Sequence, residues 1–297
     1  YKHNNILSSI QPTNSKAKLL MLLSGMLPIP GRIILCKSLM DGMTTRTDSR
    51  TGLASYICTH HYYLWSPMEK SVIVLIGGLS ITYQQFIIYM LVPICVYMCY
   101  VVYYITTLKL KLVDSGTVTK RTSVVDLILL LLCLVISCYI PVITQSLALY
   151  LIYLTIKYKP PVEVYKSIDV KTLVFVSIVL MIGCIAKHNV AYIHEYMNNI
   201  KGDLYFAMLL SFVFSFILGS SSKFAGLCLL MTIIYGIEYM VLFYVIDFSG
   251  YLLSPTHKCT LVAQSGCKTP RKAFYIKLTL ICVCMIICTG LYTWFVV

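Results

Sequence analysis

The chain has 297 residues, of which 59% are hydrophobic and only 12% are charged. Soluble domains have roughly 45–50% apolar and about 25% charged residues, so this composition excludes an ordinary water-soluble globular protein. The formal net charge of +13 comes from basic residues scattered over short polar segments rather than from one stripe, which argues against a nucleic-acid-binding protein.

Residues 1–18 are polar and predict a connecting segment outside the membrane, so the chain is expected to be the later part of something longer. The apolar segment 19–31 is shorter than the roughly 20 residues that a membrane-spanning helix needs. It contains Pro28, Pro30 and Gly31. Because prolines lack an N–H group and glycine permits non-helical angles, we expect a broken helix that resumes after this point.

Residues 52–66 include His60, His61, Tyr62, Tyr63 and Trp65, and such amphipathic rings predict a position at a membrane interface. Beyond them, 38 residues between Lys70 and Lys109 and 30 residues between Asp126 and Lys157 contain no Asp, Glu, Lys, Arg or His. Each stretch is long enough for a pair of spans. Continuous apolar runs in lipid must be helical, because backbone groups have to bond within their own segment. The expected spans are 69–84, 85–107, 123–139 and 141–157, followed by a marginal segment at 170–187.

Basic residues gather in the connections 108–122 and 157–171, which are separated by two predicted spans and so face the same side. Lysine and arginine are retained on the cytoplasmic side, so both loops are predicted to lie in the cytoplasm or, in an organelle, in the matrix. We therefore expect an integral, multi-pass protein of a plasma membrane or an organellar inner membrane.

The apolar segments after residue 203 are interrupted. Residues 204–222 are uncharged and end in a Gly-Ser-Ser-Ser sequence at 219–222, and a second apolar piece covers 227–246. A Ser-Pro-Thr-His sequence then breaks the chain at 254–257, and a last full span occupies about 275–296. Interrupted segments near both ends of a chain are typical of transporters built from repeats with broken helices.

These elements predict an all-α fold: a polytopic membrane bundle of about 8–10 membrane segments, with inverted repeats and broken helices or re-entrant hairpins. The expected regions are a polar N-terminal segment (1–18), the remnant of a first repeat with the broken helix and the interfacial stretch (19–107), a cytoplasmic basic loop (108–122), a central helix pair with a basic loop (123–171) and a second repeat with re-entrant segments (172–297).

The three breaks are the best candidates for a binding site, since non-helical backbone inside a membrane persists only where protein or a watery cavity satisfies it. The N-termini of half-helices present free N–H groups and a partial positive charge, which suits an anion. The alternative is that the prolines and serines only shape and pack the helices. The predicted substrate-binding residues are Pro28, Pro30, Gly31, Arg32, Gly219, Ser220, Ser221, Ser222, Ser254, Pro255 and His257.

Charged residues inside apolar segments are costly and suggest function. Glu238 is therefore a candidate for ion coupling, with Lys223 as its partner. Lys187 and Asp247 stand at the ends of apolar segments and are interpreted as interface residues.

The thirteen cysteines do not predict a metal site, because most lie inside apolar runs and no C-x-x-C pair occurs. His188, His194 and Glu195 resemble half of a zinc site but lack the H-E-x-x-H spacing. Since a P-loop, a dinucleotide-binding glycine pattern and a nucleophile elbow are also missing, we expect no metal, no cofactor and no enzymatic activity.

Four segments resemble an uncharacterised family of prokaryotic membrane proteins with about ten helices, placed near the gluconate, citrate and arsenite permeases of the ion-transporter superfamily. LLSGMLPIPGRIILCKSLMD (22–41) is similar to the family's L-L-P-M-P-G-G-A pattern. YICTHHYYLWSPMEKSVIVLIGGLSI (56–81) resembles its histidine- and tryptophan-bearing stretch. LLSFVFSFILGSSSKFAG (209–226) resembles its late glycine-rich segment, and GYLLSPTHKCTLVAQSG (250–266) its S-P-V-H-L-C motif.

The resemblance implies a secondary carrier with two inverted repeats whose broken helices meet near the membrane midplane. The residues that match the two clearest motifs are Pro28, Pro30 and Gly31 in the first and Ser254, Pro255 and His257 in the last.

Three departures from the family pattern are basic: Arg32 replaces a second glycine, Lys258 replaces an apolar residue, and Lys223 enters the small-residue loop. The family's opening spans are absent ahead of Tyr1. We therefore expect either that a partner chain supplies them or that transport has been lost.

The leading hypothesis is a secondary transporter, or permease, that moves a small organic or inorganic anion across the lipid bilayer and is driven by an ion gradient. One alternative is a non-transporting structural subunit of a larger membrane complex. Another is a proton-conducting subunit of a respiratory complex, motivated by Glu238 and Lys223.

Overall fold

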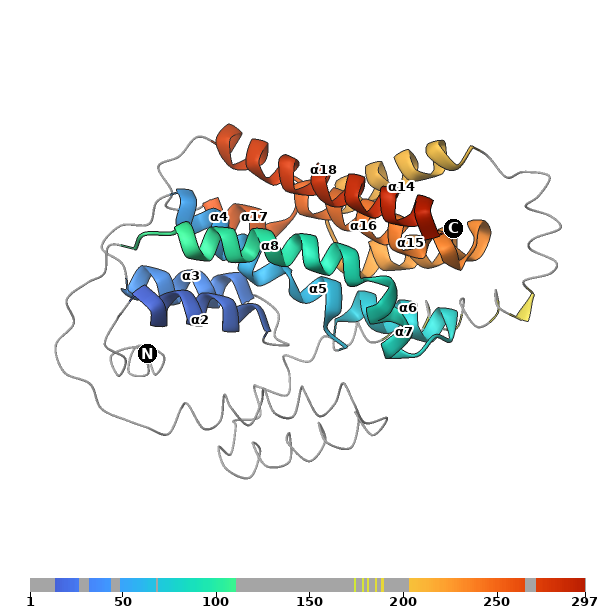
Figure 1. Ribbon diagram of the computed structural model, residues 1–297, viewed down its shortest axis with the longest axis horizontal. Helices are drawn as coiled ribbons and strands as arrows, with labels where there is room; N and C mark the ends of the chain where they lie inside the picture. The colour runs from blue at the N-terminus through green and yellow to red at the C-terminus, as the bar shows by residue number, and fades with distance from the viewer. Residues whose placement is uncertain are drawn as a thin grey trace, which may run out of the picture. The chain divides into compact units, whose positions relative to one another are not determined.

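Figure 1 shows the computed structural model of the chain, which describes residues 14–26, 32–43, 49–67, 69–110, 203–264 and 271–296, together with 174, 178, 181, 185, 188 and 189. The chain divides into two compact units: Tyr1–Gln11 with Ser115–Phe175, and Pro12–Asp114 with Val176–Val297. The second unit contains the helices α2 (Asn14–Met26), α3 (Arg32–Met43), α4 (Ser49–His60), α5 (Tyr62–Trp65), α6 (Lys70–Leu79), α7 (Tyr83–Tyr89), α8 (Leu91–Thr107), α14 (Leu204–Leu218), α15 (Ser221–Tyr235), η1 (Ile237–Tyr239), α16 (Met240–Leu253), α17 (Lys258–Gln264) and α18 (Arg271–Val296).

Helix α16 is the centre of the packing in this second unit. Every residue from Met240 to Leu252 is buried, and the helix is apolar on nearly every side. A helix that is hydrophobic all round has to be surrounded by other elements. It contacts α14, α15 and α18, which lie around it in Figure 1.

Small residues allow α14 and α16 to approach closely. Ala207, Ser211 and Ser215 recur at every fourth position of α14 and form its buried face. On the other side of the contact, a Cβ built on Gly250 would lie 2.6 Å from the carbonyl oxygen of Phe212. Close backbone contact between small residues is how helices associate in lipid, where apolar side chains gain little from meeting one another.

A second group of helices packs against the first. Helices α2, α3 and α4 contact one another, and α17 lies against α3 and α4. Helix α8 connects the two groups because it contacts both α4 and α18, and α6 packs on α15. Segments from the beginning and the end of the sequence are therefore neighbours throughout this unit.

The interruptions of the helices follow from local chemistry. Helix α14 ends at Gly219, which has φ 53° and donates its N–H to the Ser215 carbonyl at 3.0 Å, the usual left-handed helix end. Helix α7 begins at a capping box, in which Thr82 Oγ1 accepts from the Gln85 N–H and Gln85 Oε1 accepts from the Thr82 N–H.

Several predicted elements are confirmed and two need correction. The last span is present as α18, and the predicted break after residue 26 is consistent with α2 ending at Met26 and α3 starting at Arg32. The segment 69–84 is not one span, because α6 ends at Leu79 and the chain bends by 110° into α7. The segment 227–246 is also divided, since α15 ends at Tyr235 and the short helix η1 separates it from α16. The predicted spans 123–139 and 141–157 lie outside the described residues, and so does most of 170–187.

Of the helices described, only α18 is long and apolar enough to cross a membrane alone, over Arg271–Phe295 with mean hydropathy 2.2. Up to three spans result if two bent pairs each count as one: Arg50–Leu79 with Tyr83–Tyr89, and Ile237–Leu253 with Lys258–Gln264, which are joined at 49°. Within the described residues the predicted all-helical class is confirmed. The number of 8–10 membrane segments stays a prediction.

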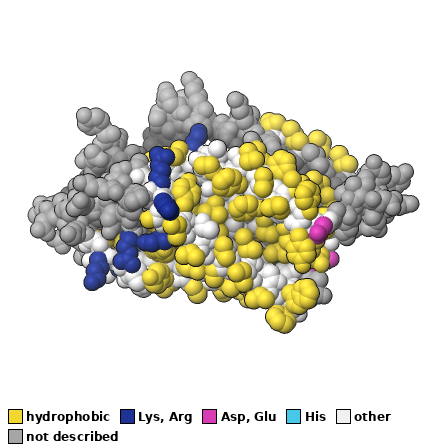
Figure 2. All heavy atoms as spheres, turned by 90° about the horizontal axis from the view of Figure 1, so that it is seen from above, with side chains coloured by type: hydrophobic (Ala, Val, Ile, Leu, Met, Phe, Trp, Pro, Cys, Tyr) yellow, Lys and Arg dark blue, Asp and Glu magenta, His cyan; other side chains and the backbone are white. Residues whose placement is uncertain are grey.

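The surface of α14 and α18 is apolar. Figure 2 shows hydrophobic side chains over most of one face, with lysine and arginine at one end and acidic side chains at the other. Its exposed apolar residues include Phe206, Leu209 and Ile217 of α14 and Leu280, Ile287 and Leu291 of α18. Contiguous exposed apolar surface of this kind marks contact with lipid or with another protein.

Residues 52–66, predicted to lie at a membrane interface, pack inside the unit, and their depth in a membrane stays a prediction. Residues 51–64 are all buried and form α4 and α5. Several of their polar groups bond to distant helices; for example, Tyr56 donates to the Leu252 carbonyl at 2.9 Å. Aromatic rings with a polar tip suit a buried polar cluster as well as they suit a membrane interface.

Candidate functional site

The turn between α16 and α17 is held by its own hydroxyl groups. Helix α16 ends at Leu253, and Pro255 has no N–H with which to continue it. The Oγ atoms of Ser254 and Thr256 are 2.8 Å apart, and the Thr256 N–H donates to Ser254 Oγ at 3.3 Å. The His257 N–H also donates to the Ser254 carbonyl at 3.3 Å, so backbone and side-chain hydrogen bonds together define the shape of the turn.

The turn after α14 lies directly against this turn. Thr256 Oγ1 donates to the Ile217 carbonyl at 3.2 Å. A Cβ built on Gly219 would lie 2.4 Å from Thr256 Oγ1 and 2.8 Å from Ser254 Oγ. Both the positive φ and the lack of space require glycine at position 219. Two of the three predicted breaks thus meet in space.

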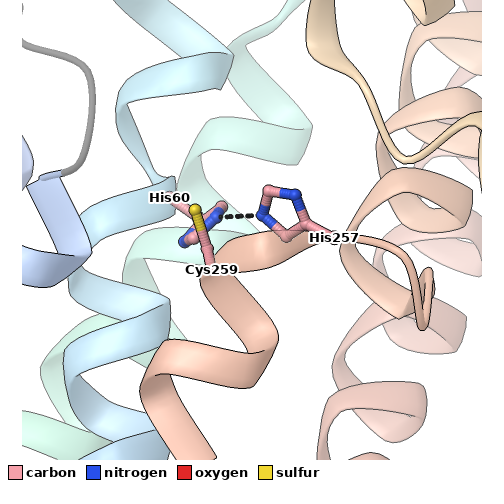
Figure 3. A group of neighbouring side chains, drawn as sticks. All are labelled: His60, His257 and Cys259. Carbon is pink, nitrogen blue, oxygen red and sulfur yellow. Dashed lines mark hydrogen bonds between the residues drawn. The ribbon is translucent and has the colours of Figure 1, made fainter.

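The imidazole of His257 extends from the turn toward His60 on α4, as Figure 3 shows. The two Nε2 atoms are 3.0 Å apart, and both side chains are buried. Cys259, in the first turn of α17, completes the group, and the ligand atoms of the three residues all lie within 4.8 Å of one another. Two imidazoles and a thiol are donors that transition metals accept.

Tyrosine rings enclose the two histidines. Tyr56 stacks on His60 with ring centroids 4.0 Å apart, and the ring centroids of Tyr251 and His257 are 4.1 Å apart. The Tyr251 hydroxyl donates to the Tyr63 hydroxyl at 2.9 Å. The cluster is therefore shielded from solvent, and electrostatic interactions within it are stronger than they are in water.

Arg32 supplies a cation at the edge of the same cluster. Its guanidinium lies 3.6 Å from the Glu69 carboxylate, and both side chains are buried. The Cζ atom stands 3.9 Å from the centre of the Tyr62 ring and 5.0 Å from that of Tyr63. The centre of the Tyr63 ring also lies 5.5 Å from that of His60. Arg32 is the first residue of α3, so the chain that follows the first predicted break also reaches the cluster.

Four of the predicted substrate-binding residues, Arg32, Gly219, Ser254 and His257, are therefore brought together around the two turns and the tyrosine shell. Ser220 is at the N-cap position of α15, next to Gly219, and Pro255 is exposed. The structure does not describe Pro28, Pro30 and Gly31, nor the side chains of Ser221, Ser222 and Lys223.

The acidic residues of the second half differ from expectation. Glu238 is exposed on η1, so the described side chain does not lie in the interior. Asp247, interpreted as an interface residue, is fully buried in α16 and accepts a hydrogen bond from Ser215 Oγ at 3.1 Å. The interface interpretation of Asp247 is wrong because three helices surround α16 at this point.

Sequence reasoning missed His60, Glu69 and Cys259 as site residues. His60 and His257 are 197 positions apart, and their contact has no local pattern. A weaker signal was present in the sequence. His257 and Cys259 are two residues apart beside a helix break, and the adjacent histidines His60 and His61 lie in an apolar stretch.

Comparison of the chain with known protein families, with curated proteins and with solved structures gives no match. The resemblance to the uncharacterised permease-like family stays a hypothesis, and the function has to be inferred from the site.

Proposed function

We propose that the chain is a multi-pass secondary carrier that moves a small anion across a membrane, with its basic loops on the cytoplasmic or matrix side. The observation that supports this most is the meeting of interrupted helices from distant parts of the sequence. The turn at 254–257 contacts Gly219 on one side and His60 on the other. Transporters bind substrate where discontinuous helices meet in this way.

The chemistry around the meeting point suits a small anion. Arg32 and His257 offer cationic or N–H donors, and Ser254 offers a hydroxyl. Helix α15 begins next to Gly219, Arg32 is the first residue of α3, and helix N-termini attract negative charge. Glu69 balances part of the charge of Arg32 at 3.6 Å, so the substrate is expected to be a small anion of low charge.

A cavity borders the turn on one side. It has a volume of about 340 Å³ and is lined by Leu253, Pro255, Gln264 and Arg271, among others. It adjoins the turn at Pro255 and does not include the buried histidines.

Asp247 is the better candidate for the coupling group, in place of Glu238. A carboxylate at the centre of the unit, held by one serine hydroxyl, favours uptake of a proton or a small cation. It lies on α16, the helix that leads into the turn at 254–257. Binding of the coupling ion would thus act on the helix that carries part of the substrate site.

The test is anion uptake into proteoliposomes, with a panel of small inorganic and organic anions and an imposed proton or sodium gradient. Arg32→Gln and Ser254→Ala are expected to lower the initial rate of uptake at least about tenfold, because each removes a direct contact in a buried site. Arg50→Gln, which changes an exposed arginine in the first turn of α4, is the matched control. Uptake of every anion at the wild-type rate in both site variants would refute the site.

A second candidate is a non-transporting structural subunit of a larger membrane complex. The observation that favours it is an apolar groove of about 770 Å³ between α14, α16 and α18, lined by Tyr205, Met208, Leu242, Ile286 and Trp294, among others. A helix from a partner subunit would fill such a groove. Purification in mild detergent separates the two functions: a constant ratio to fixed partners supports the subunit, and an active particle of this chain alone excludes it.

A further inference from the structure

The buried pair His60 and His257 is arranged to share a cation. Nδ1 of His60 lies 2.7 Å from the carbonyl oxygen of Tyr56, so in the neutral ring the proton is on Nδ1 and the lone pair is on Nε2. The Nε2 atom of His60 is therefore free of this proton, and it faces Nε2 of His257.

The two Nε2 atoms face each other across 3.0 Å. In the metal-free pair, a proton on one Nε2 joins the two rings in a hydrogen bond, and a metal ion in place of that proton would bind both nitrogens. The Tyr56 carbonyl, which fixes the outer nitrogen of His60, is a partner that metal-bound histidines commonly have, because it sets the tautomer and the ring orientation.

The separations are close to those of a metal site. With metal–nitrogen bonds of about 2.0–2.1 Å and tetrahedral angles, two imidazole nitrogens on one zinc ion are roughly 3.3 Å apart. The observed 3.0 Å needs only a small opening. The ligand atoms of all three residues lie within 4.8 Å of one another, so Cys259 Sγ is the third ligand that this pair of nitrogens offers to a metal ion.

The nearby thiol of Cys259 favours a metal ion over a proton as the cation that the two histidines share. A proton between two imidazoles needs no sulfur ligand, whereas Zn²⁺ and Cu⁺ bind thiolate and imidazole together. Arg32 is the nearby charge that opposes a cation here, and the Glu69 carboxylate 3.6 Å from its guanidinium offsets it. A thiolate at position 259 would neutralise one further positive charge.

We propose that His60 Nε2, His257 Nε2 and Cys259 Sγ bind a zinc or copper(I) ion. A zinc ion with three protein ligands keeps a fourth position open, as in catalytic rather than structural zinc sites. The site joins α4 to the turn before α17, two segments that are far apart in the sequence. It shares His257 with the proposed anion site, but metal binding is measured without transport and holds equally for a structural subunit.

Cobalt(II) is the probe, because a cysteine ligand gives a sulfur-to-cobalt charge-transfer band. The purified full chain in mild detergent is stripped with a chelator, titrated with Co²⁺ without oxygen, and then titrated with Zn²⁺. We expect one equivalent of Co²⁺ with the charge-transfer band, and displacement by Zn²⁺. Cys259→Ser is expected to lose the band, and His60→Gln to weaken binding at least about tenfold.

Two variants serve as controls: Cys99→Ser, which changes an exposed cysteine of α8, and His61→Gln, which changes the histidine next to His60. Both are expected to keep the band. A variant that does not fold is replaced by a measurement on the wild-type chain, in which Zn²⁺ should slow alkylation of Cys259, followed by mass spectrometry. Absence of the band in wild type, equal loss in the controls, or alkylation unaffected by Zn²⁺ would overturn the proposal.

Discussion

Replacing Arg32 by methionine removes the cation that stands between α3 and the segment joining α5 to α6. The guanidinium lies 3.6 Å from the Glu69 carboxylate and its Cζ atom is 3.9 Å from the centre of the Tyr62 ring. Methionine has a similar length and no charge. The substitution therefore preserves most of the volume while it removes the charge that faces the carboxylate.

The expected loss of stability follows from the burial of the pair, in which each side chain is less than a tenth exposed. Removing one partner of a buried ion pair costs about 3–5 kcal/mol, because a carboxylate is then left in a low-dielectric interior. The lost contact with the tyrosine ring adds up to about 2 kcal/mol. Protonation of Glu69 relieves part of this cost, so we expect a net loss of about 3–5 kcal/mol.

A double-mutant cycle separates the pair from other effects. Glu69→Gln alone leaves a buried guanidinium and is also expected to destabilise, whereas the double variant removes both charges and should recover much of the loss, since neutral replacements of buried pairs are often tolerated. The assay is denaturant unfolding in detergent, followed by tryptophan fluorescence. Trp65, whose ring centroid is 6.1 Å from that of Tyr62, reports on this region.

The expected coupling energy between the two positions is at least about 2 kcal/mol, as is common for residues in direct contact. If the two single losses add to the double loss within about 0.5 kcal/mol, the residues do not interact energetically and the reasoning is wrong. Arg50→Met, at an exposed arginine in the first turn of α4, is the matched control and should change stability by less than about 0.5 kcal/mol.

Two further outcomes follow from the packing of α16. Gly250→Val should lower stability by about 1–3 kcal/mol in thermal unfolding in detergent, because its Cβ would lie 2.6 Å from the Phe212 carbonyl oxygen; Gly290→Val, where nothing lies within 4 Å, should be tolerated. Asp247→Asn should keep the fold but abolish the dependence of anion uptake on the ion gradient. Gradient-driven uptake that persists in this variant would exclude Asp247 as the coupling group.

The helices with the strongest apolar patterns were the most predictable. The long uncharged stretch after Lys277 predicted α18, and the Gly-Ser-Ser-Ser and Ser-Pro sequences predicted the ends of α14 and α16. These features act locally: glycine at 219 ends a helix through its own backbone angle, and Pro255 through its missing N–H. Local chemistry of this kind is visible in a single sequence.

The candidate site was only partly predictable, because its contacts are made by tertiary packing. Ser254 and His257 were found from the break that they occupy. His60 was assigned to an interface because aromatic and histidine side chains suit both a lipid boundary and a buried polar cluster. Asp247 was assigned to an interface because composition does not show which of several apolar helices lies at the centre.

The described helices differ widely in length, and a bilayer would have to adjust to that. Helix α18 has 26 residues and α14 has 15, which at about 1.5 Å per residue correspond to roughly 39 Å and 22 Å. The hydrocarbon core of a membrane is about 30 Å thick. In the multi-pass arrangement proposed above, the long helix matches this thickness by tilting and the short one by local thinning of the bilayer. Acyl-chain length is therefore a variable to which the proposed carrier is expected to respond.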